Sequence, residues 1–243
     1  PYDLLHIYYF QTIPEIADNV REDPNFLGTW EEADMAFAFF NAPSKALVQQ
    51  ILDQNPDTCL VDTYEMTGEE WHGDKITPYY VHDLCIHPPW QAPEHGCADE
   101  KRIIMDPGVV FGTGRHQTTE DCLDLIHRLF SKEQINSVLD IGTGTGLLSL
   151  GAAALGCPAV MACDFNLLAV QTCQHNIFLN GFESRILAFQ ARGEQILAIS
   201  CDLLVANIHY DVMKIMIETP AFLDKKWFVL SGLLNSETRK ILD

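Results

Sequence analysis

A run of alternate glycines directly after a short apolar segment restricts this chain to few folds. Residues 138–148 have the sequence Val-Leu-Asp-Ile-Gly-Thr-Gly-Thr-Gly-Leu-Leu, with glycine at 142, 144 and 146. Because glycine has no Cβ, such a turn lets backbone N–H groups and the N-terminus of the next helix approach a ligand closely. The pattern predicts a nucleotide-binding loop between a strand and a helix, and we expect Asp140 to organise this loop.

A second strand that ends in an acidic residue supports a nucleotide site. Residues 147–155 are apolar and predict a helix that Gly156 ends, and residues 159–164 predict a short strand that ends at Asp164. A carboxylate about 20 residues after the glycines can accept hydrogen bonds from two ribose hydroxyls. An ordinary turn acid at the end of a strand is the alternative for Asp164.

Strands and helices alternate through the second half of the chain. The expected strands are 137–141, 159–164, 186–190, 203–208 and 227–230, and the expected helices among them are 147–155, 167–180 and 212–218. Alternation of this kind predicts an α/β fold, with a parallel sheet covered by helices on both faces. Ligands bind at the carboxyl ends of such strands, where we expect Gly142, Asp164 and Asn207 to converge.

The first part of the chain predicts a smaller α+β domain. Strands are expected at 4–10, 35–40 and 59–64, and helices at 14–20 and at 45–53, the second of them capped by Ser44. A proline-rich stretch follows and is interpreted as a linker. The predicted organisation is an acidic α+β substrate-recognition domain at 1–70, a linker at 71–100 and a second domain at 101–243.

Charge is spread unevenly along the chain, whose formal net charge is −19. Residues 1–100 contain 19 acidic and 3 basic residues, whereas residues 101–243 contain 15 and 12. An acidic surface repels phosphate backbones, so we expect no direct nucleic-acid contact and a basic protein as partner. A solvated face that only maintains solubility is the alternative. The sequence contains no membrane-length apolar run and no secretion signal, so a cytoplasmic protein is expected.

The apolar surroundings of the cysteines predict reduced thiols, and the cysteine and histidine spacing predicts no metal. Cys157, Cys163, Cys173 and Cys201 lie in or beside apolar segments, where a free thiol acts as a small hydrophobic residue. The pairs Cys85-x-His87 and His95-x-Cys97, at residues 85–97, contain the right ligand types for zinc, but they lack the usual C-x-x-C spacing.

Two further segments give the chain a specific resemblance. Residues 106–119 have the sequence Asp-Pro-Gly-Val-Val-Phe-Gly-Thr-Gly-Arg-His-Gln-Thr-Thr, and residues 205–208 have the sequence Val-Ala-Asn-Ile. Together with residues 140–146, they resemble the PrmA family, the bacterial methyltransferases that modify ribosomal protein L11. The resemblance covers residues 101–234, and the front domain only by architecture. It implies a class I S-adenosylmethionine-dependent methyltransferase with a Rossmann-like parallel sheet and a smaller N-terminal α+β domain.

The resemblance also implies an S-adenosylmethionine pocket. Thr119, Gly142, Asp164 and Asn207 match the cofactor-contacting positions of the family. Gly142 and Gly144 would admit the methionine part to the backbone, Asp164 would accept the ribose hydroxyls, and Thr119 would offer a hydroxyl. Asn207 would present its amide near the reacting centre. The alternatives are a helix cap for Thr119 and a strand-end turn residue for Asn207.

The implied reaction transfers a methyl group to lysine side-chain or terminal amines of a basic ribosomal protein. Positioning and desolvation can carry most of the rate of such a transfer, so no dedicated general base is required. Asn207 is therefore interpreted as the catalytic residue in the sense of an orienting group. Two alternatives stay open, a non-catalytic cofactor-binding interaction module and a small-molecule amine methyltransferase.

The chain departs from the family pattern at several positions. Arg115 and Gln117 replace threonine and proline of the family, and His209 and Tyr210 replace small or aliphatic residues after Asn207-Ile208. These positions lie on the expected substrate side, so the substrate and the roles of these residues stay open. The class I fold adds a helix and a hairpin beyond the strand at 227–230, so we expect the C-terminal part of the second domain to be missing.

Overall fold

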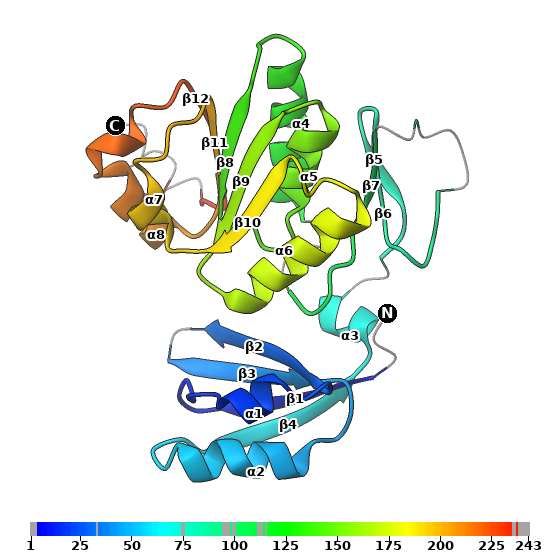
Figure 1. Ribbon diagram of the computed structural model, residues 1–243, viewed down its shortest axis with the longest axis vertical. Helices are drawn as coiled ribbons and strands as arrows, with labels where there is room; N and C mark the ends of the chain where they lie inside the picture. The colour runs from blue at the N-terminus through cyan, green and yellow to red at the C-terminus, as the bar shows by residue number, and fades with distance from the viewer. Residues whose placement is uncertain are drawn as a thin grey trace. The chain divides into compact units, whose positions relative to one another are not determined.

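The computed structural model describes residues 4–32, 34–73, 76–93, 98, 101–110, 114, 116–234 and 237 (Figure 1). The chain divides into two compact units, residues 1–75 with 108–110 and residues 76–107 with 111–243. The domain boundaries expected from the sequence stay predictions. Within the described ranges, no helix combines the length and the apolar character needed to cross a membrane.

The first unit is an antiparallel sheet with helices packed on it, as the predicted α+β architecture requires. The strand order is β2-β3-β1-β4, and its buried core joins residues of β1 and β3 to residues of α1 and α2, among them Phe10, Phe40 and Ile51. The elements are β1 (Leu5–Phe10), α1 (Asp18–Arg21), β2 (Phe26–Glu32), β3 (Met35–Phe40), α2 (Lys45–Gln54), β4 (Leu60–Met66) and α3 (Gly68–His72).

Two local expectations for this unit are wrong, and one strand was not expected. The helix expected at 14–20 is only the four-residue α1, because the chain before it stays extended and buries Ile16 in the core. Ser44 does not cap α2 with its side chain; its Oγ donates to the carbonyl of Ala42 at 2.9 Å. Strand β2 has no expected counterpart, because Gly28 lies at a β-bulge with φ of 135° and the strand ends in acidic residues.

The second unit begins with a small sheet of strand order β5-β6-β7, formed by β5 (Tyr79–Val81), β6 (Leu84–His87) and β7 (Arg102–Ile104). Strands β5 and β6 therefore lie in the proline-rich segment interpreted as a linker. All four residues of β6 are buried, and Leu84 and Ile86 belong to the hydrophobic core that also contains residues of the main sheet. His95 and Cys97 lie outside the described residues. In the described part of the chain, no cluster of three or more potential metal ligands is found.

The main sheet of the second unit is parallel, in the order β10-β9-β8-β11-β12. Helices cover both faces, as Figure 1 shows, and this confirms the predicted α/β fold. The elements are α4 (Gln117–Phe130), β8 (Ser137–Ile141), α5 (Leu147–Ala154), β9 (Ala159–Asp164), α6 (Leu167–Leu179), β10 (Ile186–Gln190), α7 (Gly193–Ile196), β11 (Leu203–Asn207), α8 (Tyr210–Ile217), η2 (Pro220–Phe222) and β12 (Trp227–Ser231).

Alternate strand residues feed two separate cores. Val138 and Val205 join the core shared with α4, α5 and α6, whereas Leu139 and Leu204 join the core shared with α8. The chain runs outward from β8 through β9 to β10, and then returns to the other side of β8 with β11. This reversal of strand order is a topological switch point, and ligands of open α/β sheets bind at the carboxyl ends of the strands there.

Candidate functional site

The glycine loop follows β8 at the switch point and is held in a conformation that only glycine adopts easily. Gly142, Gly144 and Gly146 have φ values of 71°, 56° and 86°. The backbone N–H groups of Gly142 and Thr143 donate to the carbonyl of Cys163 at 2.9 and 3.0 Å. A Cβ on Gly146 would lie 2.6 Å from Sγ of Cys173, so space and backbone conformation both require glycine there.

Asp140 ties this loop to the helix that follows, as expected from the sequence. Its Oδ2 accepts hydrogen bonds from Oγ1 of Thr143 at 2.7 Å and from Oγ of Ser149 at 2.6 Å. Its Oδ1 is buried without a hydrogen-bond partner among the described residues. Burial raises the pKa of Asp140 to about 6, although the two hydroxyls lower it. The loop is thus held by a carboxylate that is costly to keep charged.

Asp164 ends β9 and contacts the same loop. Its Oδ2 accepts from the backbone N–H of Gly144 and its Oδ1 from that of Asn166, each at 3.0 Å. Burial raises the pKa of Asp164 above its usual value, against the effect of these backbone donors. The contact with Asn166 is that of a turn acid, and Asn166 itself caps α6 by accepting from the N–H of Leu168. The contact with Gly144 places the carboxylate beside the glycine loop as well.

Asn207 ends β11 and is held by two hydroxyls of α4. Its Nδ2 donates to Oγ1 of Thr118 and to Oγ1 of Thr119, both at 3.3 Å. Thr119 is buried, and it is not the cap of α4; the capping residue is His116, whose side chain accepts from the N–H of Thr118. The helix-cap alternative for Thr119 is therefore wrong. Asn207 is more than a turn residue, because its side chain connects β11 to α4.

Thr118 and His116 contribute to this arrangement, and their contributions were not predicted from the sequence. The signal was present in the His-x-Thr-Thr end of residues 106–119, but only the packing of α4 beside β11 brings it to Asn207. Of the residues that depart from the family pattern, Arg115 lies outside the described residues. His209 precedes α8 and is exposed, and Tyr210 is the first residue of α8.

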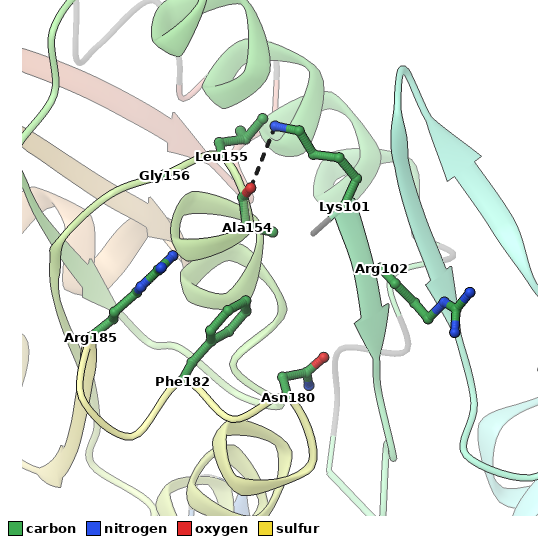
Figure 2. A pocket seen from close by; sticks show the side chains of 8 residues that line it. All are labelled: Lys101, Arg102, Ala154, Leu155, Gly156, Asn180, Phe182 and Arg185. Atoms are coloured by element: carbon green, nitrogen blue, oxygen red, sulfur yellow. Dashed lines mark hydrogen bonds between the residues drawn. The ribbon is translucent and has the colours of Figure 1, made fainter. Parts of the chain in front are cut away.

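A cavity of about 410 Å³ in the second unit lies away from all of these groups (Figure 2). Residues at the C-terminal end of α5 line this cavity, whereas the glycine loop precedes the N-terminal end of that helix. Nζ of Lys101 donates to the carbonyl of Ala154 at 3.4 Å, and Nη1 of Arg185 donates to that of Ala153 at 3.2 Å. Cations at a helix C-terminus stabilise the helix, so these side chains have a structural role.

The described cysteines are all free, and Cys157, Cys163, Cys173 and Cys201 are buried, as predicted. Burial raises the pKa of the Cys163 and Cys173 thiols to about 12, so both stay protonated and apolar beside the glycine loop. These two thiols therefore pack beside the site as apolar groups and carry no charge there.

A known protein family matches most of this chain. The family model described as Ribosomal protein L11 methyltransferase (PrmA) matches residues 14–243. The chain belongs to this family. The ribosomal protein L11 methyltransferases of two strains of Streptococcus pyogenes, serotypes M6 and M28, are 36% and 35% identical to it over 196 residues. The alignment covers 75% of this chain and 59% of each relative, so the chain spans less than two thirds of their length.

A solved structure agrees with this assignment. The crystal structure of ribosomal protein L11 methylase from Lactobacillus delbrueckii subsp. bulgaricus superimposes with a TM-score of 0.55 and 26% sequence identity, and it covers 68% of this chain and 83% of that one. The predicted PrmA resemblance and the predicted class I Rossmann-like fold are thereby confirmed.

Proposed function

We propose that this chain is part of an S-adenosylmethionine-dependent methyltransferase that methylates amines of ribosomal protein L11. The observation that carries the proposal is the junction of the glycine loop with Asp164. There, a loop of positive φ values and a strand-end carboxylate meet at the switch point of a parallel sheet, in a chain that belongs to the PrmA family.

The residues present fit this cofactor. Helix α5 begins directly after Gly146 without a side-chain cap, so the N–H groups of its first turn can bind the carboxylate of the methionine part. Each oxygen of Asp164 accepts one backbone N–H and has further lone pairs for the ribose hydroxyls. Thr119 offers a hydroxyl from α4, and Gly142 and Gly144 allow close approach to the backbone. When bound, S-adenosylmethionine supplies a methyl group on a cationic sulfonium.

Asn207 would orient the amine that accepts the methyl group. Its Nδ2 is occupied by the hydroxyls of Thr118 and Thr119, so its Oδ1 is the group that can accept an N–H from an incoming amine. A lysine or terminal amine that leaves water beside a cation is favoured in its neutral form. Position and desolvation then carry the transfer, and no general base is needed.

The charge distribution supports a basic protein as substrate. Residues 1–100 contain 19 acidic and 3 basic residues, and such a surface attracts cationic partners and repels nucleic acid. We therefore assign substrate recognition to the acidic first part of the chain and chemistry to the second unit.

The test is transfer of label from methyl-labelled S-adenosylmethionine to purified ribosomal protein L11 by the full-length protein. We expect Asp164→Ala to reduce transfer at least about hundredfold, because hydrogen bonds to a charged group contribute roughly 1.5–3 kcal/mol each. Asp224→Ala is the matched control, since Asp224 is an exposed carboxylate in the same unit. Circular dichroism would check that both variants fold.

Other outcomes would replace this proposal with a specific alternative. Cofactor binding without transfer to L11 or to any basic protein would indicate a non-catalytic interaction module. Transfer to small amines at an undiminished rate after removal of residues 1–70 would indicate a small-molecule amine methyltransferase.

A further inference from the structure

We propose that His116 is a positioning residue that fixes the orientation of the Asn207 amide through the hydroxyl of Thr118. The proposal rests on the proposed function, because it deepens the role of Asn207. Three described residues of the second unit form a continuous chain of hydrogen bonds. Nδ1 of His116 lies 2.7 Å from Oγ1 of Thr118, and that oxygen lies 3.3 Å from Nδ2 of Asn207.

The direction of each hydrogen bond in this chain follows from which groups can only donate. The backbone N–H of Thr118 points at Nδ1 of His116 at 3.4 Å, so we assign the tautomer in which Nδ1 is the acceptor and shares its one lone pair between this N–H and the Thr118 hydroxyl. The Asn207 amide nitrogen also can only donate, so Oγ1 of Thr118 accepts from it. The hydroxyl proton of Thr118 is therefore directed to Nδ1 of His116.

The consequence is a single orientation for the side chain of Asn207. With its proton committed to His116, the Thr118 hydroxyl presents only lone pairs to Asn207 and favours the NH₂ end of the amide. Oγ1 of Thr119 accepts from the same nitrogen at 3.3 Å. Both threonines thus select one of the two flipped states of the amide, and Oδ1 becomes the end offered to a substrate amine.

The chain of hydrogen bonds begins at His116, which lies at the start of a helix that is packed into the core. The helix has 14 residues and packs into the core through Thr119, Cys122, Leu123 and Ile126. His116 has φ of −72° and ψ of 133° and caps the N–H of Thr118. Ser, Thr, Asp and Asn are the preferred residues at such a cap, so a histidine there is unusual for capping alone. Its Nδ1 serves both the helix cap and the Thr118 hydroxyl.

The experiment compares two pairs of variants in the full-length protein. His116→Ala removes the acceptor and His116→Asn restores one at the same cap; Thr118→Val removes the hydroxyl and Thr118→Ser keeps it. Ser131→Ala is the control, because Ser131 follows the far end of α4 and donates to the carbonyl of Arg128. The measured quantities are kcat and KM for methyl transfer to L11, below the unfolding temperature of every variant.

We expect His116→Ala and Thr118→Val to lower kcat about tenfold with KM changed less than about threefold, since a misplaced orienting group slows chemistry more than binding. His116→Asn, Thr118→Ser and Ser131→Ala should stay within about threefold of the starting kcat. In an Asn207→Ala background, His116→Ala should cause no further loss, because the group it positions is gone. Unchanged kcat in His116→Ala, failure of His116→Asn to restore it, or a multiplied loss with Asn207→Ala would overturn the proposal.

A second measurement separates this proposal from the proposed function. The side-chain amide of Asn207 gives a pair of nitrogen-15 correlated NMR signals, whose positions report its hydrogen bonds without any activity. His116→Ala should shift these signals and His116→Asn should return them towards their starting positions. If the protein transfers no methyl group to L11, the proposed function fails, while the amide signals still decide whether His116 orients Asn207.

Discussion

The second unit contains two groups of carboxylates in opposite environments. Asp140 and Asp164 are buried beside the glycine loop, and burial raises the pKa of both. Asp83, in the turn between β5 and β6, and Asp124, on α4, are 56% and 30% exposed in their side chains. The pKa of each is lowered. At Asp83 desolvation opposes the shift, and the hydrogen bond with His127 and the charge of Lys101 outweigh it; at Asp124 the hydrogen bond with His82 is the largest cause.

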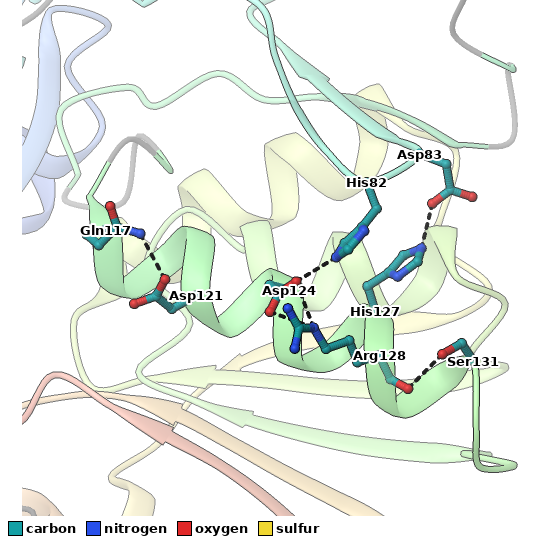
Figure 3. Close-up of polar contacts among 8 residues, drawn as sticks. All are labelled: His82, Asp83, Gln117, Asp121, Asp124, His127, Arg128 and Ser131. Carbon is teal, nitrogen blue, oxygen red and sulfur yellow. Dashed lines mark hydrogen bonds and ion pairs between the residues drawn. The ribbon is translucent and has the colours of Figure 1, made fainter.

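The exposed carboxylates belong to a network that connects the β5–β6 turn to α4 (Figure 3). Nε2 of His82 lies 2.6 Å from Oδ1 of Asp124, and Nε2 of His127 lies 2.7 Å from Oδ1 of Asp83. The two imidazole rings stack with centroids 4.2 Å apart. Arg128 pairs with Asp124 from the next turn of the helix at 2.9 Å. Each carboxylate therefore has a cationic or polar partner and water as well.

A carboxylate therefore has opposite effects on the free energy of unfolding according to its access to water. A buried carboxylate with too few partners opposes folding as it becomes charged, whereas an exposed paired carboxylate favours folding weakly. The glycine loop is therefore held by a carboxylate, Asp140, that destabilises the folded protein when it is charged, as is common at ligand sites. The contact between the β5–β6 turn and α4 is held by carboxylates that stabilise it.

The contribution of a carboxylate to the free energy of unfolding should change with pH in opposite directions in the two groups. The largest effect is expected for Asp140→Asn. The pKa of Asp140 is raised from 3.8 to about 6 in the folded protein, so stability falls as the pH rises through that window. The carboxamide removes this fall while it can still accept from Thr143 and Ser149. The free energy of unfolding of Asp140→Asn minus that of the unmodified protein should increase by about 3 kcal/mol across the window.

Urea unfolding at several pH values from 3.5 to about 7 measures this difference, with Asp224→Asn as the control for an exposed carboxylate. A difference that stays constant with pH would contradict the assignment of a costly buried charge to Asp140.

Removal of a single partner of Asp140 should have the next largest effect. Ser149→Ala deletes the hydroxyl that donates to Oδ2 at 2.6 Å, and Thr143 then remains the hydroxyl donor to that oxygen. We expect a loss of about 2 kcal/mol at pH 7, the usual range for a hydrogen bond to a buried charged group. Ser131→Ala, which deletes a hydroxyl bonded to a carbonyl at the end of α4, should cost below about 0.5 kcal/mol. Equal losses in chemical unfolding would argue against a special role for Ser149.

The exposed network should respond more weakly and with the opposite sign. The folded pKa of Asp124 is depressed, so its contribution is present above the unfolded pKa and is lost as the pH falls through the folded value. Asp124→Asn should therefore lower the unfolding free energy by less than about 1 kcal/mol at pH 6, and by less still near pH 3. Thermal unfolding at the two pH values tests this; a loss that grows on acidification would be inconsistent with the network.

The smallest expected effect is that of salt on the coupling energy within the exposed network. The coupling between His127 and Asp83, from a double-mutant cycle with His127→Gln and Asp83→Asn, should be roughly 0.5 kcal/mol in dilute buffer and should shrink at 1 M salt, where the screening length is about 3 Å. The cost of Ser149→Ala should not change with salt, because its hydrogen bond is buried. A coupling that survives high salt would show that the ring stacking, and not charge, holds the β5–β6 turn.

Much of the parallel sheet could be predicted residue by residue. The expected strands 137–141, 159–164 and 186–190 coincide with β8, β9 and β10, because each is a short apolar segment bounded by glycine, proline or polar residues. The β5–β6 hairpin could not be predicted, since its strands are three and four residues long and lie among prolines. Their stability comes from burial of Leu84 and Ile86 in a core built by distant segments.

The candidate site divides in the same way. Gly142, Asp164 and Asn207 could be predicted because each stands at the end of a strand, and parallel strands bring such ends to one edge. The partners of Asn207 could not be predicted. Thr118 precedes it by 89 residues, and the hydrogen bond between them exists only because α4 packs beside β11 and β12.

The glycine loop, the alternation of strands and helices and the family of this protein all follow from the amino-acid sequence, because local backbone preference and apolar periodicity act between neighbouring residues. The folded arrangement is needed to show which oxygen of Asp140 lacks a donor among the described residues, which residue caps α4 and which hydroxyls hold Asn207. Those properties depend on distances of about 3 Å between segments far apart in the chain, and these distances are set by how the two cores pack on the faces of the sheet.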